Sequence, residues 1–168
     1  MRFIRIALSL LLAVPCMAQE SKPVIAPAGV LSSLEMQQLM PSSVFFQGQT
    51  ATTQLRNSFG VRFANGGLVL AGLVDTGGYS SAVRGKYQFY LLSDTSFEID
   101  GKKLGPGAYG GGFVQDGFLV MDLGANNLFQ GKVDRDPTMT RPRPLQIQAG
   151  KNPVEFRLCG GRDCVTIR

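Results

Sequence analysis

The chain has 168 residues, a formal net charge of +5 and no histidine. Without histidine it lacks the base of histidine-dependent catalytic triads and the commonest ligand of transition metals. The lysines and arginines are spread along the sequence and form no basic stripe, so we do not expect a nucleic-acid partner. The length suits one domain with a hydrophobic core of its own.

The first 18 residues have the layout of a secretory signal peptide. Arg2 and Arg5 precede an apolar run over residues 6–14, and small residues follow up to Ala18. The run is too short to span a bilayer, which needs ~20 apolar residues. We therefore predict cleavage after Ala18 and export to the periplasm or the extracellular space. The net charge would fall to +3, because the removed segment carries two arginines and no acid. Lipid attachment at Cys16 remains an alternative.

Residues 19–29 contain two prolines and little that could pack, which indicates a flexible leader. The next segment ends at Pro41, which stops a helix. It places four residues at roughly helical spacing: Leu31, Leu34, Gln38 and Leu39. We predict one short helix between the leader and Pro41.

After Pro41, short β-rich runs alternate with Gly, Asn and Asp. This pattern predicts an antiparallel all-β domain over residues 30–168, a sandwich or a barrel built from hairpins. Three dipeptides that tolerate positive φ favour two-residue hairpin turns, namely Asn65-Gly66, Asp100-Gly101 and Asp116-Gly117. The predicted strands are residues 44–47, 52–56, 61–63, 68–74, 87–92, 96–99, 108–114, 118–123, 145–148, 154–159 and 164–167.

Residues 105–110 read GPGAYG and match the pattern G-x-G-x-x-G. In a dinucleotide site a helix opens at the third glycine, and its amides bind the pyrophosphate. Here two more glycines follow Gly110, and a helix through three glycines costs about 2–3 kcal/mol relative to alanine. We therefore predict a hairpin strand and no cofactor. The bare backbone at Gly110–Gly112 would allow either an aromatic ring to lie on it or a flexible flap.

Residues 131–145 carry three prolines and six charged side chains. Proline removes backbone donors from a sheet, so we expect a long exposed loop or extended arm. It is either a solvated crossover or a partner-binding arm with Arg141 and Arg143 pointing outward.

Cys159 and Cys164 are flanked by two short runs that alternate apolar and polar residues. A hairpin with a loop of about four residues, 160–163, would place the two sulfurs across from each other. Because export implies an oxidising compartment, we predict a disulfide. Two thiolates without histidine are only half a zinc site, so we expect no metal.

Leu73-Val74-Asp75-Thr76-Gly77 resembles the active-site loop of retropepsin-like aspartic proteases. The resemblance implies a homodimer in which each chain supplies Asp75, Thr76 and Gly77. The two carboxylates would share one proton, so that one acts as a base toward water and the other as an acid. From the residues alone, we favour Asp75 as the capping residue of a β-turn.

The segment Met121–Leu128 is partly similar to the glycine-containing segment that packs near this loop in the same family. The resemblance also gives Gly110–Gly112 the role of a flap. Outside these segments, the chain is similar to exported bacterial β-proteins with no assigned role.

Tyr79, Tyr87, Phe89 and Tyr90 form a dense aromatic region. Strand alternation would place Tyr87 and Phe89 on one face and Tyr90 on the other. We interpret the region as core packing or, alternatively, as a surface that binds a carbohydrate or an apolar ligand.

The sequence contains no complete catalytic set. We therefore predict an exported, non-catalytic binding or structural module for an unknown small molecule, glycan or protein. Two alternatives remain, a homodimeric acid protease that uses Asp75 and a carrier for small apolar ligands or carbohydrates.

Overall fold

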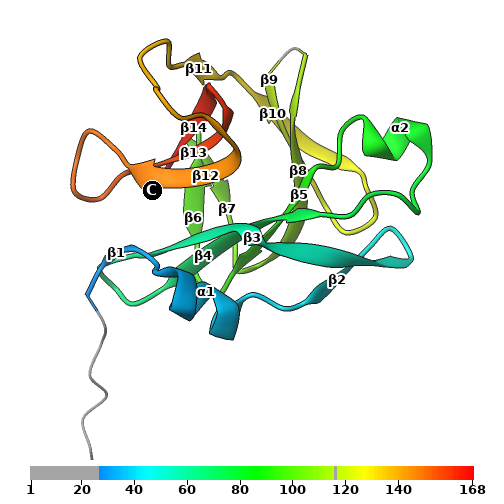
Figure 1. Cartoon of the computed structure of the whole chain (residues 1–168), viewed down its shortest axis with the longest axis horizontal. Helices are drawn as coiled ribbons and strands as arrows, with labels where there is room; N and C mark the ends of the chain where they lie inside the picture. Colours follow the sequence, from blue (N-terminus) through cyan, green and yellow to red (C-terminus); the bar gives the residue numbers. More distant parts are fainter. Residues whose placement is uncertain (1–26, 116) are drawn as a thin grey trace, which may run out of the picture.

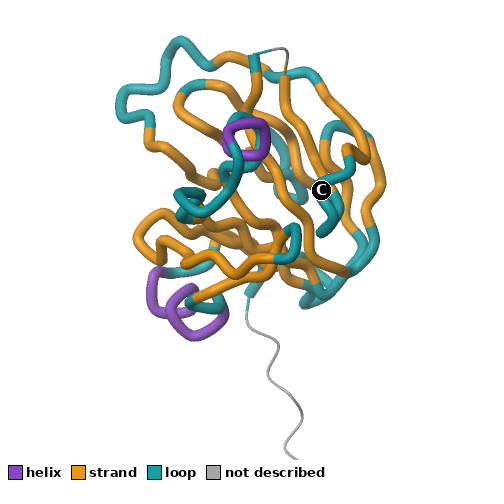
Figure 2. Tube along the Cα trace, turned by 90° about the vertical axis from the view of Figure 1, so that its right-hand side faces the viewer, coloured by secondary structure: helices purple, strands orange, loops and turns teal. Residues whose placement is uncertain are grey.

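The computed structural model describes residues 27–168 except residue 116. Two antiparallel sheets pack together, and two short helices lie at the periphery (Figures 1 and 2). The prediction of an antiparallel all-β domain is confirmed, and of the two predicted alternatives, sandwich and barrel, the structure is sandwich-like. The predicted signal peptide, its cleavage site and most of the predicted leader lie outside the described residues. Neither helix is long and apolar enough to cross a membrane, within the part of the chain that the structure describes.

The first sheet contains eight strands. In spatial order they are β1 (Gly29–Val30), β3 (Gln49–Arg62), β4 (Leu68–Val74), β5 (Phe89–Ser93), β8 (Gly107–Val114), β9 (Gly117–Met121) and β10 (Asn127–Gly131), with β2 (Ser43–Phe46) paired to β3. Because β1 starts at Gly29, the sheet begins inside the predicted leader.

The second sheet contains six strands, and all its pairings are antiparallel. Their order is β12 (Arg143–Ala149), β13 (Phe156–Gly161), β14 (Asp163–Ile167), β6 (Phe97–Ile99) and β7 (Lys102–Leu104), with β11 (Asp134–Arg135) paired to β14.

The main core fills the space between the two sheets. Side chains alternate along each strand, so Val69 and Ala71 of β4 enter this core while Leu70 and Val74 join clusters outside it. The buried residues of the main core are Val61, Val69, Ala71, Phe89, Leu91, Phe97, Ile99, Leu104, Phe118, Val120, Leu145, Ile147, Phe156, Leu158, Val165 and Ile167. The first sheet is therefore apolar on both faces, which explains why the sequence of β9 reads as an unbroken apolar run.

Helix α1 (Ser33–Leu39) begins with a capping box. The backbone N–H of Glu35 donates to Ser32 Oγ at 3.3 Å, and the N–H of Ser32 donates to Glu35 Oε2 at 2.8 Å. These two bonds satisfy donors that the first helical turn leaves open. The predicted short helix is confirmed, while a second helix, α2 (Ser81–Arg84), carried no periodic signal in the sequence.

Of the residues at helical spacing, Leu31 is buried, whereas Leu34 and Leu39 are 66% and 37% exposed. Met36 and Met40 are the buried residues that α1 and its C-terminal end contribute. Leu31 precedes the helix, and its N–H donates to the carbonyl of Gly60 at 2.8 Å, so helical spacing does not extend to it.

The glycines of β8 lie under aromatic rings. A Cβ atom on Gly110 would overlap the ring of Phe46, and one on Gly111 would overlap the ring of Phe89. At Gly112 the obstacle is the carbonyl oxygen of Lys86. β8 is paired on both sides, to β5 and to β9, so no helix opens after GPGAYG and these glycines form no flap. Of the two alternatives, an aromatic ring on bare backbone is confirmed.

The predicted turns differ in outcome. Asp100 and Gly101, with φ of 49° and 73°, form a two-residue turn as expected. Asn65-Gly66 instead lies in a five-residue loop, because β3 and β4 stop pairing at Arg62 and Leu68 and the loop closes through its own backbone hydrogen bonds. Asp116 lies outside the described residues, and the last pair between β8 and β9 is Val114 with Gly117.

The predicted disulfide joins Cys159 and Cys164, which face each other on β13 and β14. The loop is shorter than expected, because Gly160 still pairs with Asp163 and only two residues make the turn. Gly161 occupies the left-handed region with φ of 62°. Met139 packs against the disulfide from the irregular segment that precedes β12.

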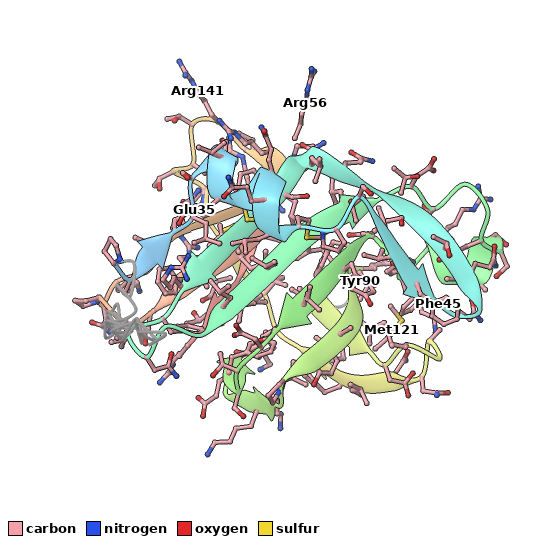
Figure 3. All side chains as sticks on the ribbon, turned by 90° about the horizontal axis from the view of Figure 1, so that it is seen from below. Glu35, Phe45, Arg56, Tyr90, Met121 and Arg141 are labelled. Carbon is pink, nitrogen blue, oxygen red and sulfur yellow. A yellow bond between two sulfur atoms is a disulfide. The ribbon has the colours of Figure 1, made fainter. Side chains whose placement is uncertain are left out.

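The proline-rich segment is mostly irregular, as predicted. Its regular parts are β11 and the start of β12, which begins at Arg143. Arg141 and Arg143 are exposed, and Figure 3 shows Arg141 extending away from the ribbon.

Replacing Gly110 with alanine should lower the free energy of unfolding by about 1–3 kcal/mol, because the added methyl group would displace the ring of Phe46. That ring cannot move freely, since it stacks on Tyr87 with centroids 3.8 Å apart. Urea denaturation would measure the change. Gly105→Ala is the matched control, because a Cβ at that position meets nothing within 4 Å. Equal stabilities of the two variants would contradict this account of the glycines.

Replacing both Cys159 and Cys164 with alanine should lower the free energy of unfolding by about 2 kcal/mol, because the disulfide closes only a short loop. A reductant should lower the urea midpoint of the unmodified protein and leave the urea midpoint of the double variant unchanged. If the reductant had no effect on the unmodified protein, the disulfide would not contribute as described.

Candidate functional site

Asp75 lies directly after β4, and its side chain is exposed. The N–H of Gly77 donates to Asp75 Oδ1 at 3.0 Å, and the N–H of Asp75 donates to the carbonyl of Thr52 at 2.9 Å. The carboxylate therefore closes a local turn, in agreement with the turn-capping interpretation. The pairing of two Asp75 side chains that the protease resemblance implies would require a second copy of the chain.

Asp122, in the second segment of that resemblance, closes a turn of its own. It accepts hydrogen bonds from Asn126 Nδ2 and from the backbone N–H groups of Asn126 and Gly124. These bonds hold the pKa of Asp122 below its ordinary value, and the bonds from Asn126 have the largest effect. Each of the two aspartates thus has its own local partners, and no hydrogen bond joins them within the described residues.

The four aromatic residues are buried, with at most 6% exposure, and present no surface to a ligand. Tyr79, Tyr87 and Tyr90 belong to one cluster, whereas Phe89 belongs to the main core. The expected sharing of one face by Tyr87 and Phe89 is wrong, because Tyr87 precedes β5. Its N–H donates to the carbonyl of Val83 at 2.8 Å, in a turn that continues α2, so strand alternation does not reach it.

The hydroxyl of Tyr87 is buried and has no hydrogen-bond partner among the described residues. Burial, with the nearby Tyr79 and Tyr90, raises the pKa of Tyr87 far above its ordinary value. Tyr79 donates to the carbonyl of Phe46 at 3.1 Å. The cluster is therefore an uncharged core on the outer face of the first sheet.

A groove of about 820 Å³ lies between α1, β3 and β12. Most of its wall is apolar, and two arginines, Arg56 and Arg143, are its only charged lining residues within the described chain. Figure 3 shows Arg56 extending from β3 on the side of the molecule that carries α1. The remaining lining residues are Val30, Leu31, Ser33, Met36, Gln37, Leu55, Ser58, Phe59 and Ile147. Sequence reasoning did not predict this groove.

A large bulge in β3 places Leu55 and Arg56 in the groove. Thr53 pairs with Val74 and Ser58 pairs with Gly72, so residues 54–57 lie opposite one residue of β4. The bulge is fixed by its own hydrogen bonds, because Ser58 Oγ donates to the carbonyl of Gln54 at 2.9 Å and Asn57 Nδ2 donates to Gln54 Oε1 at 2.9 Å. Bulges bend a strand and change the direction of its side chains.

A second bulge lies next to Arg143. Arg143 pairs with Gly161 and Gln146 pairs with Cys159, so residues 144 and 145 share one partner on β13. Pro144 is the one readable signal of this bulge, because proline within a sheet is found at edges and bulges. The two arginines therefore reach one groove from bulged strands of different sheets.

The groove is positively charged. Neither Arg56 nor Arg143 has an ion-pair partner within residues 27–115 and 117–168. The acid of α1, Glu35, is already engaged by Ser32 and by Arg62, whose Nη2 lies 3.3 Å from Glu35 Oε1. Hydrogen bonds from Ser32, together with Arg62, lower the pKa of Glu35 and keep it ionised. The groove therefore suits a ligand that has an anionic group and an apolar body.

A second hollow, of about 620 Å³, lies beside β11 and β14. Its charged lining residues are balanced in sign, three basic and three acidic, namely Arg135, Lys151, Arg157, Asp134, Asp136 and Glu155. Arg157 Nη1 lies 2.8 Å from Asp136 Oδ2, so these charges are largely satisfied within the protein. This hollow is a weaker candidate for binding a charged ligand.

No family model matches the sequence, and neither a curated protein nor a solved structure matches it in the corresponding comparisons. The function is therefore argued from the groove itself.

Protonation of Asp136 in acid should lower the free energy of unfolding. Hydrogen bonds from Thr138 and Arg157 lower the pKa of Asp136 from 3.8 to about 2. A lowered folded-state pKa contributes stability that is present above the ordinary pKa and is lost as the pH falls toward 2. Urea midpoints measured between about pH 5 and 2 should therefore fall more steeply for the unmodified protein than for Asp136→Asn. Thr138→Ala should reduce the slope in part. Parallel profiles for all three proteins would contradict this role.

Proposed function

We propose that the protein is a non-catalytic binding module that holds a ligand with an anionic group and an apolar body in the groove between α1, β3 and β12. The observation that carries the proposal is the convergence of Arg56 and Arg143 on one apolar groove, each from a bulged strand and neither with an acidic partner among the described residues.

The chemistry of the lining supports this proposal. An arginine presents a planar set of donors that matches a carboxylate or a phosphate. The apolar wall would add roughly 25 cal/mol for each Å² of ligand surface that it removes from water. The volume of about 820 Å³ lies in the range of small-molecule sites.

The absence of a base in the groove supports a binding role over catalysis. The lining includes no acid, cysteine or lysine within the described residues. Its hydroxyl groups belong to Ser33 and Ser58, and that of Ser58 donates to the carbonyl of Gln54. A serine nucleophile needs an adjacent base to be activated. The disulfide supports the proposal that the module acts in an oxidising compartment, the periplasm or the extracellular space.

Anilinonaphthalene sulfonate, an apolar dye with one anionic group, should bind the purified protein saturably. Replacing both Arg56 and Arg143 with glutamine should weaken this binding by about tenfold or more, because charge-assisted hydrogen bonds to the sulfonate are lost. Fluorescence titration at low ionic strength would measure both affinities, with circular dichroism to confirm that each variant is folded.

Arg84→Gln is the matched control. Arg84 is exposed on α2, which lies away from α1 in Figures 1 and 2 and contributes no residue to the groove. This variant removes one positive charge by the same substitution, half the change in the double variant, and should leave the affinity unchanged. A folded protein without saturable binding, or an equal loss of affinity in the control, would refute the proposal.

A further inference from the structure

We infer that the ligand of the groove is a long-chain monocarboxylate, a free fatty acid, whose carboxylate lies between Arg56 and Arg143 and whose alkyl chain lies along the apolar wall. This inference rests on the proposed function and specifies its ligand class.

The distribution of polar groups in the groove favours a ligand with a single polar end. Among the described residues its cations are Arg56, in the bulge of β3, and Arg143, next to the bulge of β12, while Leu31, Met36 and Ile147 provide an apolar wall. Apart from the arginines, the lining side chains that can form hydrogen bonds are Ser33, Gln37 and Ser58, within the described chain. Ser58 is already engaged with the carbonyl of Gln54.

Other ligand classes need more hydrogen-bond partners than this lining offers. A peptide carries an N–H and a C=O group at each residue, and each of them needs a partner once it is buried. A glycan carries several hydroxyl groups with the same requirement. An unbranched alkyl chain needs none, and the unbranched side chain of Met36 can adapt to its shape.

The head group is chosen from the donors that the groove offers. Arginine side chains match either a carboxylate or a phosphate. A carboxylate presents two oxygen acceptors, whereas a phosphate monoester presents three, and the charged donors among the described lining residues are only Arg56 and Arg143. The carboxylate therefore makes the smaller demand on this lining, and a phosphate head group is the competing outcome of the test.

The test compares dodecanoate, its methyl ester and dodecyl phosphate as competitors of anilinonaphthalene sulfonate, all below their micelle concentrations. We expect dodecanoate to bind at least about tenfold more tightly than the ester, because only the acid forms charge-assisted hydrogen bonds. Affinity should increase from octanoate to decanoate to dodecanoate by up to about fourfold for each added methylene. In the variant with both Arg56 and Arg143 replaced by glutamine, acid and ester should bind equally, whereas Arg84→Gln should keep the preference.

Methionine methyl spectra locate the bound chain. Dodecanoate should shift the methyl signal of Met36, which lines the groove. The methyl signal of Met121, which is buried in the tyrosine cluster, should stay unchanged. Leu55→Ser should weaken the binding of dodecanoate without unfolding the protein, because Leu55 is already 39% exposed.

Three results would overturn the inference: equal affinity for acid and ester in the unmodified protein, tighter binding of dodecyl phosphate, or an unshifted Met36 signal in the presence of bound dodecanoate. With each of these results the proposed function still stands, provided that the dye binds and that its binding depends on Arg56 and Arg143. Failure of dye binding itself would refute both.

Discussion

A bulge at residues 54–57 bends β3 and divides it into two parts that pair with different strands. Beyond the bulge, residues 58–62 pair with β4 as part of the first sheet, and before it residues 49–52 pair with β2. The bend allows the β2–β3 hairpin to cover the outer face of the sheet, where Phe46 and Ala51 pack in one cluster with Tyr87 and Met121. A straight strand would leave this face uncovered. The same bulge brings Leu55 and Arg56 to the groove, so one irregularity serves both packing and the candidate site.

The close approach of this hairpin depends on glycine in β8. Phe46 lies on Gly110 and stacks on Tyr87, and Tyr79 meets the ring of Tyr87 edge to face with centroids 5.4 Å apart. The rings of Phe46 and Phe89 fill the space that side chains at residues 110 and 111 would otherwise occupy. The sequence pattern that imitates a dinucleotide-binding motif is therefore a packing surface, and the physical reason is the absence of Cβ atoms in a central strand.

Features that depend on neighbouring residues were predictable from the sequence. β4 has the predicted bounds, Asp100-Gly101 forms the expected turn, and Cys159 is joined to Cys164. Features that depend on distant contacts were not. The predicted gap between residues 56 and 61 is part of one long strand with a bulge, which no local propensity reveals. The groove could not be predicted from the sequence either. Arg56 and Arg143 are far apart in the sequence and line one groove only when the two sheets pack.

The three arginines of this region differ in a way that follows from their burial. The side chain of Arg62 is 17% exposed and pairs with Glu35, because an unpaired charge in that position would lose its hydration without compensation. Arg56 and Arg143 are exposed and remain hydrated, so having no ion-pair partner among the described residues costs the folded state little. Surface ion pairs contribute about 0–1 kcal/mol, so pairing them internally would add little stability and would remove the charge that a ligand needs. Glu35 thus pairs with the partly buried Arg62, and the two exposed arginines remain open toward the apolar wall.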